Sequence, residues 1–232
     1  MARSLPLHPD TIAAAAVRIA DAEGLDAVSM RRVAGTLGVS AMALYRHVAD
    51  RRALLLLMAD AAKDFALLPP GVATWQATLE HMADAQWQAF QAHPWLLHIV
   101  LTPRRLVNLA TPGEVELLLA RLRGAGLTEE QGFDCLLGIS AAVIGAASIT
   151  AAAQSGPEQS GPDDHAQWNS GAVARFPLAA RFQDQGISSA ASRRSLDFVV
   201  ANFIRGVEQA LGQFPGSAMR PVSWKEENAT EG

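Results

Sequence analysis

The sequence has little of several things that define whole classes of protein. Cys135 is its single cysteine, so neither an intramolecular disulfide nor a cysteine-rich zinc site can form, and a reducing cytoplasm is the natural compartment. β-Branched and aromatic residues are sparse whereas Ala and Leu are abundant, which favours an all-helical protein. The opening stretch, MARSLPLHPD, lacks the apolar segment of a signal peptide. We therefore expect an all-α, cytoplasmic protein.

Charged side chains are absent from residues 135–157, a stretch of 23 residues that is long enough to cross a membrane. Ala, Gly, Ser, Thr and Gln dilute its hydrophobicity, and neither an aromatic belt nor a basic flank follows it. We expect a helix that is buried on nearly all sides instead, and no membrane among the partners.

The chain also lacks an excess of basic residues, since its net charge is −4. The charge is unevenly distributed. Residues 1–52 hold seven Arg against five acidic residues, a net +2, whereas residues 53–232 hold 12 Lys and Arg against 18 acidic residues, a net −6. The N-terminal segment is therefore the only candidate for binding a polyanion.

Helical periodicity predicts four helices in the N-terminal part, at residues 9–23, 30–36, 41–47 and 51–68. Each begins near a residue whose side chain can cap a helix, namely Asp10, Ser29, Ser40 and Asp50. Gly24 ends the first helix. Further helices are predicted at residues 75–93, 94–101, 104–109, 113–124, 128–154 and 191–211, with a loop at 155–171. Thr128 and Gln131 form a capping-box start.

The sequence predicts a helix-turn-helix motif around Gly38, which separates two short helical segments. The turn in this motif needs a residue that tolerates positive φ, and glycine does so. A close crossing of the two helices needs a small residue, here Ala34. The core needs apolar groups, and the sequence supplies them at Val33, Leu37, Val39 and Leu44.

An ordinary helical hairpin inside a core is the alternative, and it predicts Leu or Ala on the remaining faces of the third helix. The sequence places Tyr45, Arg46 and His47 there instead, and Arg51 and Arg52 begin the next helix. Phosphate oxygens and base edges bind such donors. The pattern therefore favours double-stranded DNA as a partner over a purely structural role.

The segment GLDAVSMRRVAGTLGVSAMALYRHVADRRALLLLMADA resembles the N-terminal DNA-binding domain of the tetracycline-repressor (TetR) family of transcriptional regulators. Its most specific parts are Leu44-Tyr45-x-His47-Val48 and Arg52-Ala53-Leu54-Leu55, and the match covers residues 9–68. The rest is more weakly similar to the regulatory domain of the tetracycline repressors, through Trp75-Gln76, Ala92-His93 and Gly126-Leu127-Thr128-Glu129. The resemblance implies an all-helical homodimer that binds a palindromic operator and releases it when a small molecule binds.

The resemblance also implies a set of DNA-binding residues: Ser29, Arg31, Ser40, Ala41, Met42, Tyr45, Arg46, His47 and Arg51. In this set Arg31 reads a base, and Tyr45, His47 and Arg51 hold the DNA backbone. Arg46 stands where another bulky residue is common in the family. Alternatives remain open, because Arg31 and Arg46 could be solvated surface cations and His47 could close the small core.

Candidate ligand-binding residues are Met82, Gln86, Phe90, Trp95, Leu118, Phe133 and Leu136. Met82, Gln86 and Leu118 match positions where tetracycline repressors carry polar and aromatic drug contacts. The histidine that ligates the drug's magnesium has no counterpart, since His98 lies two residues away. We therefore expect no metal or other cofactor, and a mostly apolar small-molecule effector. The aromatic residues of this set could equally belong to the core.

The predicted dimer uses the helices at residues 128–154 and 191–211 as a four-helix bundle across a two-fold axis. The first helix carries the small residues Gly138, Ala141, Ala142, Gly145 and Ala146, and the second carries the apolar residues Leu196, Val199, Val200, Phe203, Ile204 and Val207.

The expected organisation is a helix-turn-helix domain at residues 1–52, a linking helix at 53–68, a regulatory and dimerisation domain at 69–214 and a flexible tail at 215–232. The expected function is a ligand-responsive transcriptional repressor. A DNA-binding regulator controlled by a protein partner, without a small-molecule ligand, is the alternative. An enzyme is a third class, but no phosphate loop, nucleophile elbow or paired carboxylates support it.

Overall fold

The described part of the protein is all-helical, as predicted. The computed structural model describes residues 7–62, 74–100, 112–154, 175–176 and 193–213. In chain order its elements are α1 (Pro9–Glu23), η1 (Leu25–Ala27), α2 (Met30–Leu37), α3 (Ala41–Tyr45), α4 (Arg51–Ala61), α5 (Trp75–Ala92), α6 (Leu96–Val100), α7 (Pro112–Gly124), α8 (Glu129–Gln154) and α12 (Arg193–Gln213). The predicted helix at 104–109, the loop at 155–171 and the tail after 215 lie outside these residues.

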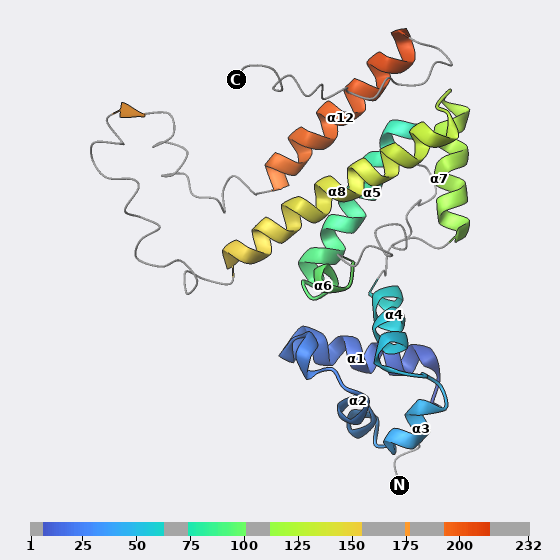
Figure 1. Cartoon of the computed structure of the whole chain (residues 1–232), viewed down its shortest axis with the longest axis vertical. Coiled ribbons are helices and arrows are strands. Elements are labelled where there is room, and N and C mark those ends of the chain that lie inside the picture. Colours follow the sequence, from blue (N-terminus) through green and yellow to red (C-terminus); the bar gives the residue numbers. More distant parts are fainter. Residues whose placement is uncertain (1–6, 63–73, 101–111, 155–174, 177–192, 214–232) are drawn as a thin grey trace, which may run out of the picture.

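The helices form two groups (Figure 1). Helices α1 to α4 make an N-terminal helical unit, and α5 to α8 with α12 make a second group, with α4 between the two. In the N-terminal unit α1 packs most extensively on α4, and α2 packs on both α1 and α3. Each helix places at least one fully buried apolar side chain in the shared core, among them Ile12, Val33, Leu44 and Leu54. Each such burial contributes about 1.5–3 kcal/mol, and it stabilises helices too short to persist alone.

Side chains cap α2, α3 and α4 as the sequence predicts. Ser29, Ser40 and Asp50 each accept a hydrogen bond from the backbone N–H three residues later, over 3.1, 3.2 and 2.7 Å. Thr74 caps α5 in the same way over 3.2 Å, which was not predicted. A cap of this kind contributes about 1 kcal/mol, so these residues fix where each helix begins.

The start of α1 differs from the prediction. Its N-cap is His8, which makes no side-chain cap hydrogen bond, and Pro9 occupies the first turn. Proline suits that position because its φ is already helical and it has no N–H to satisfy. Asp10 therefore lies within the first turn, where its charge complements the helix dipole, and the prediction that it caps α1 is wrong.

The helix α8 is central to the second group, where it packs against α5, α7 and α12. The capping box that begins it is confirmed, because the Thr128 N–H donates to Gln131 Oε1 over 2.8 Å and the Gln131 N–H donates to Thr128 Oγ1 over 3.2 Å. By length and composition α8 could cross a membrane, a test that core helices of soluble domains also pass. Burial, and then the charge of Asp134, raises the pKa of the Cys135 thiol on α8 to about 11.

The expectation that α8 is buried on nearly all sides is wrong. Only 33% of its most apolar window is buried within the chain. One face packs inward, whereas the other carries a row of exposed small and apolar residues at intervals of four, namely Phe133, Leu137, Ala141, Gly145 and Ile149. We call this the outer row of α8. A helix repeats nearly every four residues, so the row forms one continuous strip.

The packing of α12 on α8 uses residues that were predicted to face a second subunit. A Cβ on Gly138 would lie 2.9 Å from the Phe203 ring of the same chain, so this glycine permits close packing within the subunit. Four apolar residues of α12 are likewise buried within the chain: Leu196, Val200, Ile204 and Val207. Their assignment to a dimer interface is therefore wrong. Phe198 and Val199 remain exposed, at 70% and 46%.

A charged contact also joins α12 to α5. Arg193 donates hydrogen bonds to Asp84 on α5 and to Asp197 on α12. Burial lowers the pKa of the Arg193 guanidinium, but the hydrogen bonds and charges of Asp197 and Asp84 outweigh it, so that the pKa is raised. The same residues line a groove of about 340 Å³ between the two helices, to which Leu196 and Val200 also contribute.

Candidate functional site

The turn between α2 and α3 has the geometry predicted at Gly38. This residue lies in the left-handed region, with φ 68° and ψ 25°. The Gly38 N–H donates to the Gly35 carbonyl over 3.2 Å, and the Val39 N–H donates to the Ala34 carbonyl over 3.0 Å. A Cβ on Gly38 would meet nothing within 4 Å, so the position requires glycine for its backbone angles and not for space.

The helix α3 presents its polar and large apolar side chains outward. Leu44 and Val48 are buried at 0% and 2%, whereas Met42 and Tyr45 are 70% and 47% exposed. Arg46 and His47 are exposed as well, and Ala41 is half-buried. His47 does not close the small core, which removes that alternative for it. A short helix that exposes Met42 and Tyr45, and that is followed directly by the exposed residues Arg46 and His47, suits a groove with phosphates along its edges.

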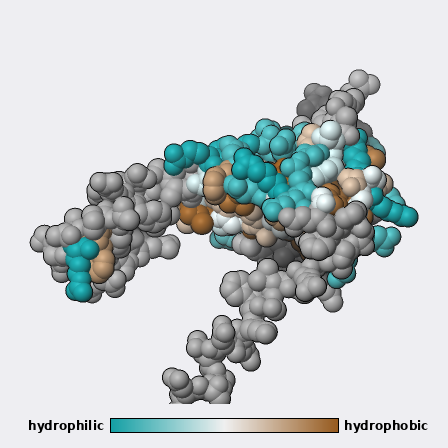
Figure 2. Space-filling model, turned by 90° about the horizontal axis from the view of Figure 1, so that it is seen from above, coloured by the Kyte–Doolittle hydropathy of each residue, from teal (hydrophilic) through white to brown (hydrophobic). Residues whose placement is uncertain are grey.

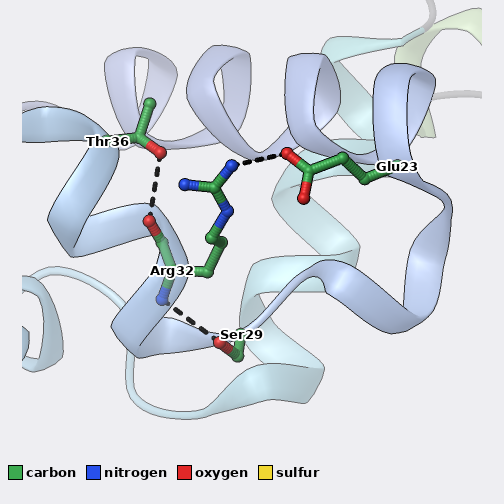
Figure 3. Close-up of polar contacts among 4 residues, drawn as sticks. All are labelled: Glu23, Ser29, Arg32 and Thr36. Carbon is green, nitrogen blue, oxygen red and sulfur yellow. Dashed lines mark hydrogen bonds and ion pairs between the residues drawn. The ribbon is translucent and has the colours of Figure 1, made fainter.

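The two arginines at the start of α2 have different surroundings, and Figure 3 shows those of Arg32. The Arg32 guanidinium donates to Glu23 Oε1 over 2.5 Å, which ties α2 to the end of α1. The Arg32 backbone is also engaged, because its N–H donates to Ser29 Oγ and its carbonyl accepts from Thr36 Oγ1 over 3.1 Å. Arg31 is exposed at the surface. Of the two, Arg31 is therefore the one placed to reach a partner, as the resemblance implies.

Arg51 has a structural role that was not predicted. Its Nε donates to the Val28 carbonyl and its Nη2 donates to the Leu25 carbonyl, each over 3.3 Å. These bonds hold the start of α4 against the η1 turn. The phosphate contact assigned to Arg51 stays a prediction, and the guanidinium contributes to the packing of the unit in any case.

The predicted ligand-binding residues divide into a buried group and outliers. Met82, Gln86, Phe90 and Leu118 are buried, at 1–4% exposure. Leu136 is half-buried, whereas Phe133 is 45% exposed and belongs to the outer row of α8. None of these residues lines the groove between α5 and α12.

The carboxamide of Gln86 is the one buried polar group in this set. Its Nε2 donates to Ser140 Oγ on α8 over 3.1 Å, and both residues are buried. Within the described part of the chain, Gln86 Oε1 is the buried side-chain oxygen that has no hydrogen-bond partner. A buried acceptor without a donor costs about 1–3 kcal/mol.

Trp95 is buried as well, and its side chain contacts the N-terminal unit. Its Nε1 donates to Asp21 Oδ1 on α1 over 2.7 Å, and His93 Nδ1 lies 2.7 Å from the same oxygen. Asp21 and His93 were not predicted as functional residues. No sequence signal joins them, because their separation of 72 residues exceeds any local pattern.

An exposed helix that follows a left-handed glycine turn, supported by a three-helix core, defines the helix-turn-helix class of DNA-binding proteins. Two family descriptions match the chain. "Bacterial regulatory proteins, tetR family" matches residues 12–58, and "Tetracyclin repressor-like, C-terminal domain" matches residues 68–211. The chain belongs to the tetR family of transcriptional regulators.

Curated relatives carry the same class of name. The chain is 38% identical over 139 residues to the HTH-type transcriptional repressor DrrR1 of Streptomyces coeruleorubidus, a match that covers 59% of this chain and 51% of the relative. It is 29% identical over 148 residues to the class E tetracycline repressor protein of Escherichia coli. That match covers 60% of this chain and 67% of the repressor. The chain thus spans about half the length of DrrR1.

Solved structures agree with the described fold. One is the TetR family protein ActR from Streptomyces coelicolor in complex with actinorhodin, which has a TM-score of 0.61 and 29% sequence identity. The match covers 87% of this chain and 97% of the ActR chain. The regulator SCO7222 of the same organism has a TM-score of 0.67 at 23% identity, covering 88% and 99%. The second likeness bears on the fold alone.

Proposed function

We propose that this protein is a cytoplasmic, homodimeric repressor that binds a palindromic DNA operator and releases it when a small, mostly apolar effector binds. The outward-facing helix α3 carries this proposal. Met42 and Tyr45 are 70% and 47% exposed on this helix, which directly follows the left-handed turn at Gly38. In a major groove Met42 would meet base edges and thymine methyl groups, with Tyr45 and His47 at the phosphates.

The homodimer is supported by the outer row of α8. Leu137 and Ile149 are 41% and 47% exposed, and the small residues Ala141 and Gly145 between them would let a second helix approach closely. On α12, Phe198 and Val199 are exposed too. The described surface therefore carries hydrophobic residues among the hydrophilic ones (Figure 2). A second copy of α8 and α12 would complete a four-helix bundle.

The effector site is supported by the buried group on α5 and α7. Met82, Phe90 and Leu118 supply apolar walls, and Gln86 Oε1 offers one unmatched acceptor. An effector that fits them is mostly apolar and carries a hydrogen-bond donor, such as a hydroxyl group, for Gln86. ActR, at 29% identity, binds actinorhodin, so a relative of this fold takes a small molecule.

The proposed division of the chain is a DNA-binding domain at residues 1–52, a linking helix at 53–68, a regulatory and dimerisation domain at 69–214 and a tail at 215–232. The separate family matches to residues 12–58 and 68–211 support a boundary between about 58 and 68.

The direct test is binding of the full-length protein to DNA from upstream of its own gene. We expect specific binding whose affinity falls steeply with salt, because phosphate contacts release counterions. Compounds that release the protein from this DNA are then screened by fluorescence anisotropy. Absence of specific binding would overturn the repressor proposal. Binding without release by any small molecule would favour control by a protein partner.

A further inference from the structure

One carboxylate joins the N-terminal helical unit to the regulatory part of the chain. Asp21, near the end of α1, accepts a hydrogen bond from Trp95 Nε1 over 2.7 Å, and its same oxygen lies 2.7 Å from His93 Nδ1. His93 and Trp95 lie between the end of α5 and the start of α6. We call these three residues the domain clasp.

The domain clasp is well supported on the regulatory side. His93 is the C-cap of α5, and its N–H donates to the Ala89 carbonyl over 2.8 Å. The Trp95 side chain is buried, with the residue only 5% exposed, and its ring centroid lies 5.6 Å from that of His93. Because both donors are held by their own surroundings, Asp21 is bound in one geometry and not by a mobile surface side chain.

Because Asp21 lies on α1, the packing contacts of α1 connect its position to that of the other helices of the N-terminal unit. Helix α1 makes its most extensive contact with α4 and also packs on α2, which in turn packs on α3. A weaker contact joins α4 to α6. The domain clasp and the α4–α6 contact together therefore fix the direction in which α3 points from the regulatory part.

We propose that Asp21 is a positioning residue for operator binding, which acts through His93 and Trp95 to set the orientation of α3 on the regulatory domain. This inference rests on the proposed function as a dimer that binds two half-sites. Two recognition helices must enter successive major grooves about 34–36 Å apart. A fixed orientation makes binding depend on the spacing of the half-sites, and a loose one weakens that dependence.

The domain clasp also lies on the path from the proposed effector site. Gln86 and Phe90 lie on α5, about two turns and one turn before His93, which directly follows the last residue of this helix. A ligand that displaces the end of α5 would therefore move the two donors that hold α1.

The test compares three full-length proteins: wild type, Asp21→Ala and Asp10→Ala. Asp10 is an exposed carboxylate on the same helix, so its removal is the matched control.

The probes are DNA duplexes that carry two copies of the half-site bound by wild type, at the native spacing or with one or two added base pairs. A further duplex carries one half-site. We expect Asp21→Ala to bind the native duplex about tenfold more weakly, which corresponds to the loss of one or two hydrogen bonds. Its affinity should also depend less on the spacing of the two half-sites. Its affinity for the single half-site should be unchanged.

Two further variants separate hydrogen bonding from folding. Asp21→Asn keeps an acceptor for Trp95 and should retain the spacing dependence, whereas Trp95→Phe keeps the buried ring, loses the donor and should flatten it. An Asp21→Ala protein with an unchanged spacing dependence overturns the proposal, as does an equal loss on every duplex together with a lowered melting temperature. If the wild-type protein binds none of the duplexes, the proposed function itself has failed. This outcome is distinct from a failure of the inference about Asp21, which concerns only the variants.

Discussion

At the scale of single residues, Arg31 on α2 is the side chain that we propose reads a base of the operator. It is exposed, whereas the neighbouring Arg32 is held by Glu23. We predict that Arg31→Ala weakens operator binding by about 1–3 kcal/mol, the usual worth of a bidentate contact with a base. The loss should be confined to operators with the native base at one position of each half-site. Binding to a set of single-base operator variants checks this.

Arg32→Ala is the matched control for Arg31→Ala. The ion pair of Arg32 with Glu23 is about half exposed on both sides, so its removal should change the free energy of unfolding by no more than ~1 kcal/mol. It should leave the base preference of the protein intact. Equal changes in base preference for the two variants would contradict the assignment of Arg31.

Arg51 should matter for folding as well as for DNA. Its guanidinium donates to the carbonyls of Leu25 and Val28, and a charged donor strengthens such bonds. We predict that Arg51→Ala lowers the free energy of unfolding by about 1–2 kcal/mol, measured by urea denaturation. If stability stays unchanged while the slope of affinity against salt falls by about one unit, Arg51 acts at phosphate alone, as the resemblance implies.

At the scale of helices, the turn at Gly38 gives a prediction with an internal control. Gly38→Ala places a side chain at a φ of 68°, which should destabilise the protein by about 1–2 kcal/mol although no atom blocks the Cβ. Gly35→Ala lies inside α2, where a Cβ also meets nothing within 4 Å, and should stabilise the protein by about 0.5–1 kcal/mol. Thermal unfolding of both variants tests the pair. A stability gain at both positions would show that backbone angles at Gly38 are not limiting.

Local chemistry predicts the helices well, because a cap or a turn acts within a few residues. Ser29, Ser40 and Asp50 were identified as caps for that reason, and Gly38 as the turn. Asp10 is not a cap because Pro9 suits the first helical position, which makes His8 the N-cap, two residues before Asp10.

Contacts between helices could not be predicted from local chemistry. Trp95 and Phe133 were assigned to the ligand site by type, but their surroundings depend on which helix faces which. The indole of Trp95 donates to α1, and Phe133 lies on the open side of α8. The apolar face of α12 was predicted correctly as apolar, yet it packs on its own chain, since periodicity identifies a buried face without naming its partner.

At the scale of the whole molecule, the outer row of α8 predicts a dimer that one residue can break. Gly145 is exposed, and a Cβ there meets nothing within 4 Å in the same chain. We predict that Gly145→Arg leaves each subunit folded but raises the dissociation constant of the dimer at least a hundredfold, because a bulky charge would separate the two helices. Sedimentation at micromolar concentration measures the mass. Gly124→Arg on α7, also without a contact within 4 Å, should remain dimeric. A monomeric wild type would contradict the dimer itself.

Release of DNA by an effector requires binding energy that differs between two states of the dimer. A nearly complete switch needs about 5.5 kcal/mol of preference for the state that cannot bind DNA. At about 25 cal/mol per Å², burial of some 200 Å² of apolar ligand surface against Met82, Phe90 and Leu118 is of that order. The hydrogen bond to Gln86 Oε1 adds specificity, since that oxygen is otherwise unmatched.

Gln86→Met tests this arrangement, because methionine has a similar length and offers neither a donor nor a strong acceptor. We predict that the concentration of effector needed to release DNA rises about tenfold or more, the cost of one buried hydrogen bond. Operator affinity without effector should stay within about threefold of wild type, because Gln86 lies on α5, which belongs to the other group of helices from α3 (Figure 1). Gln91→Met, at an exposed position of the same helix, is the control and should respond to the effector as wild type does.

Gln86→Trp, which fills the proposed site, should abolish the response to the effector. If both Gln86 variants release DNA at the normal concentration, the effector binds elsewhere, and the groove between α5 and α12 becomes the next site to test.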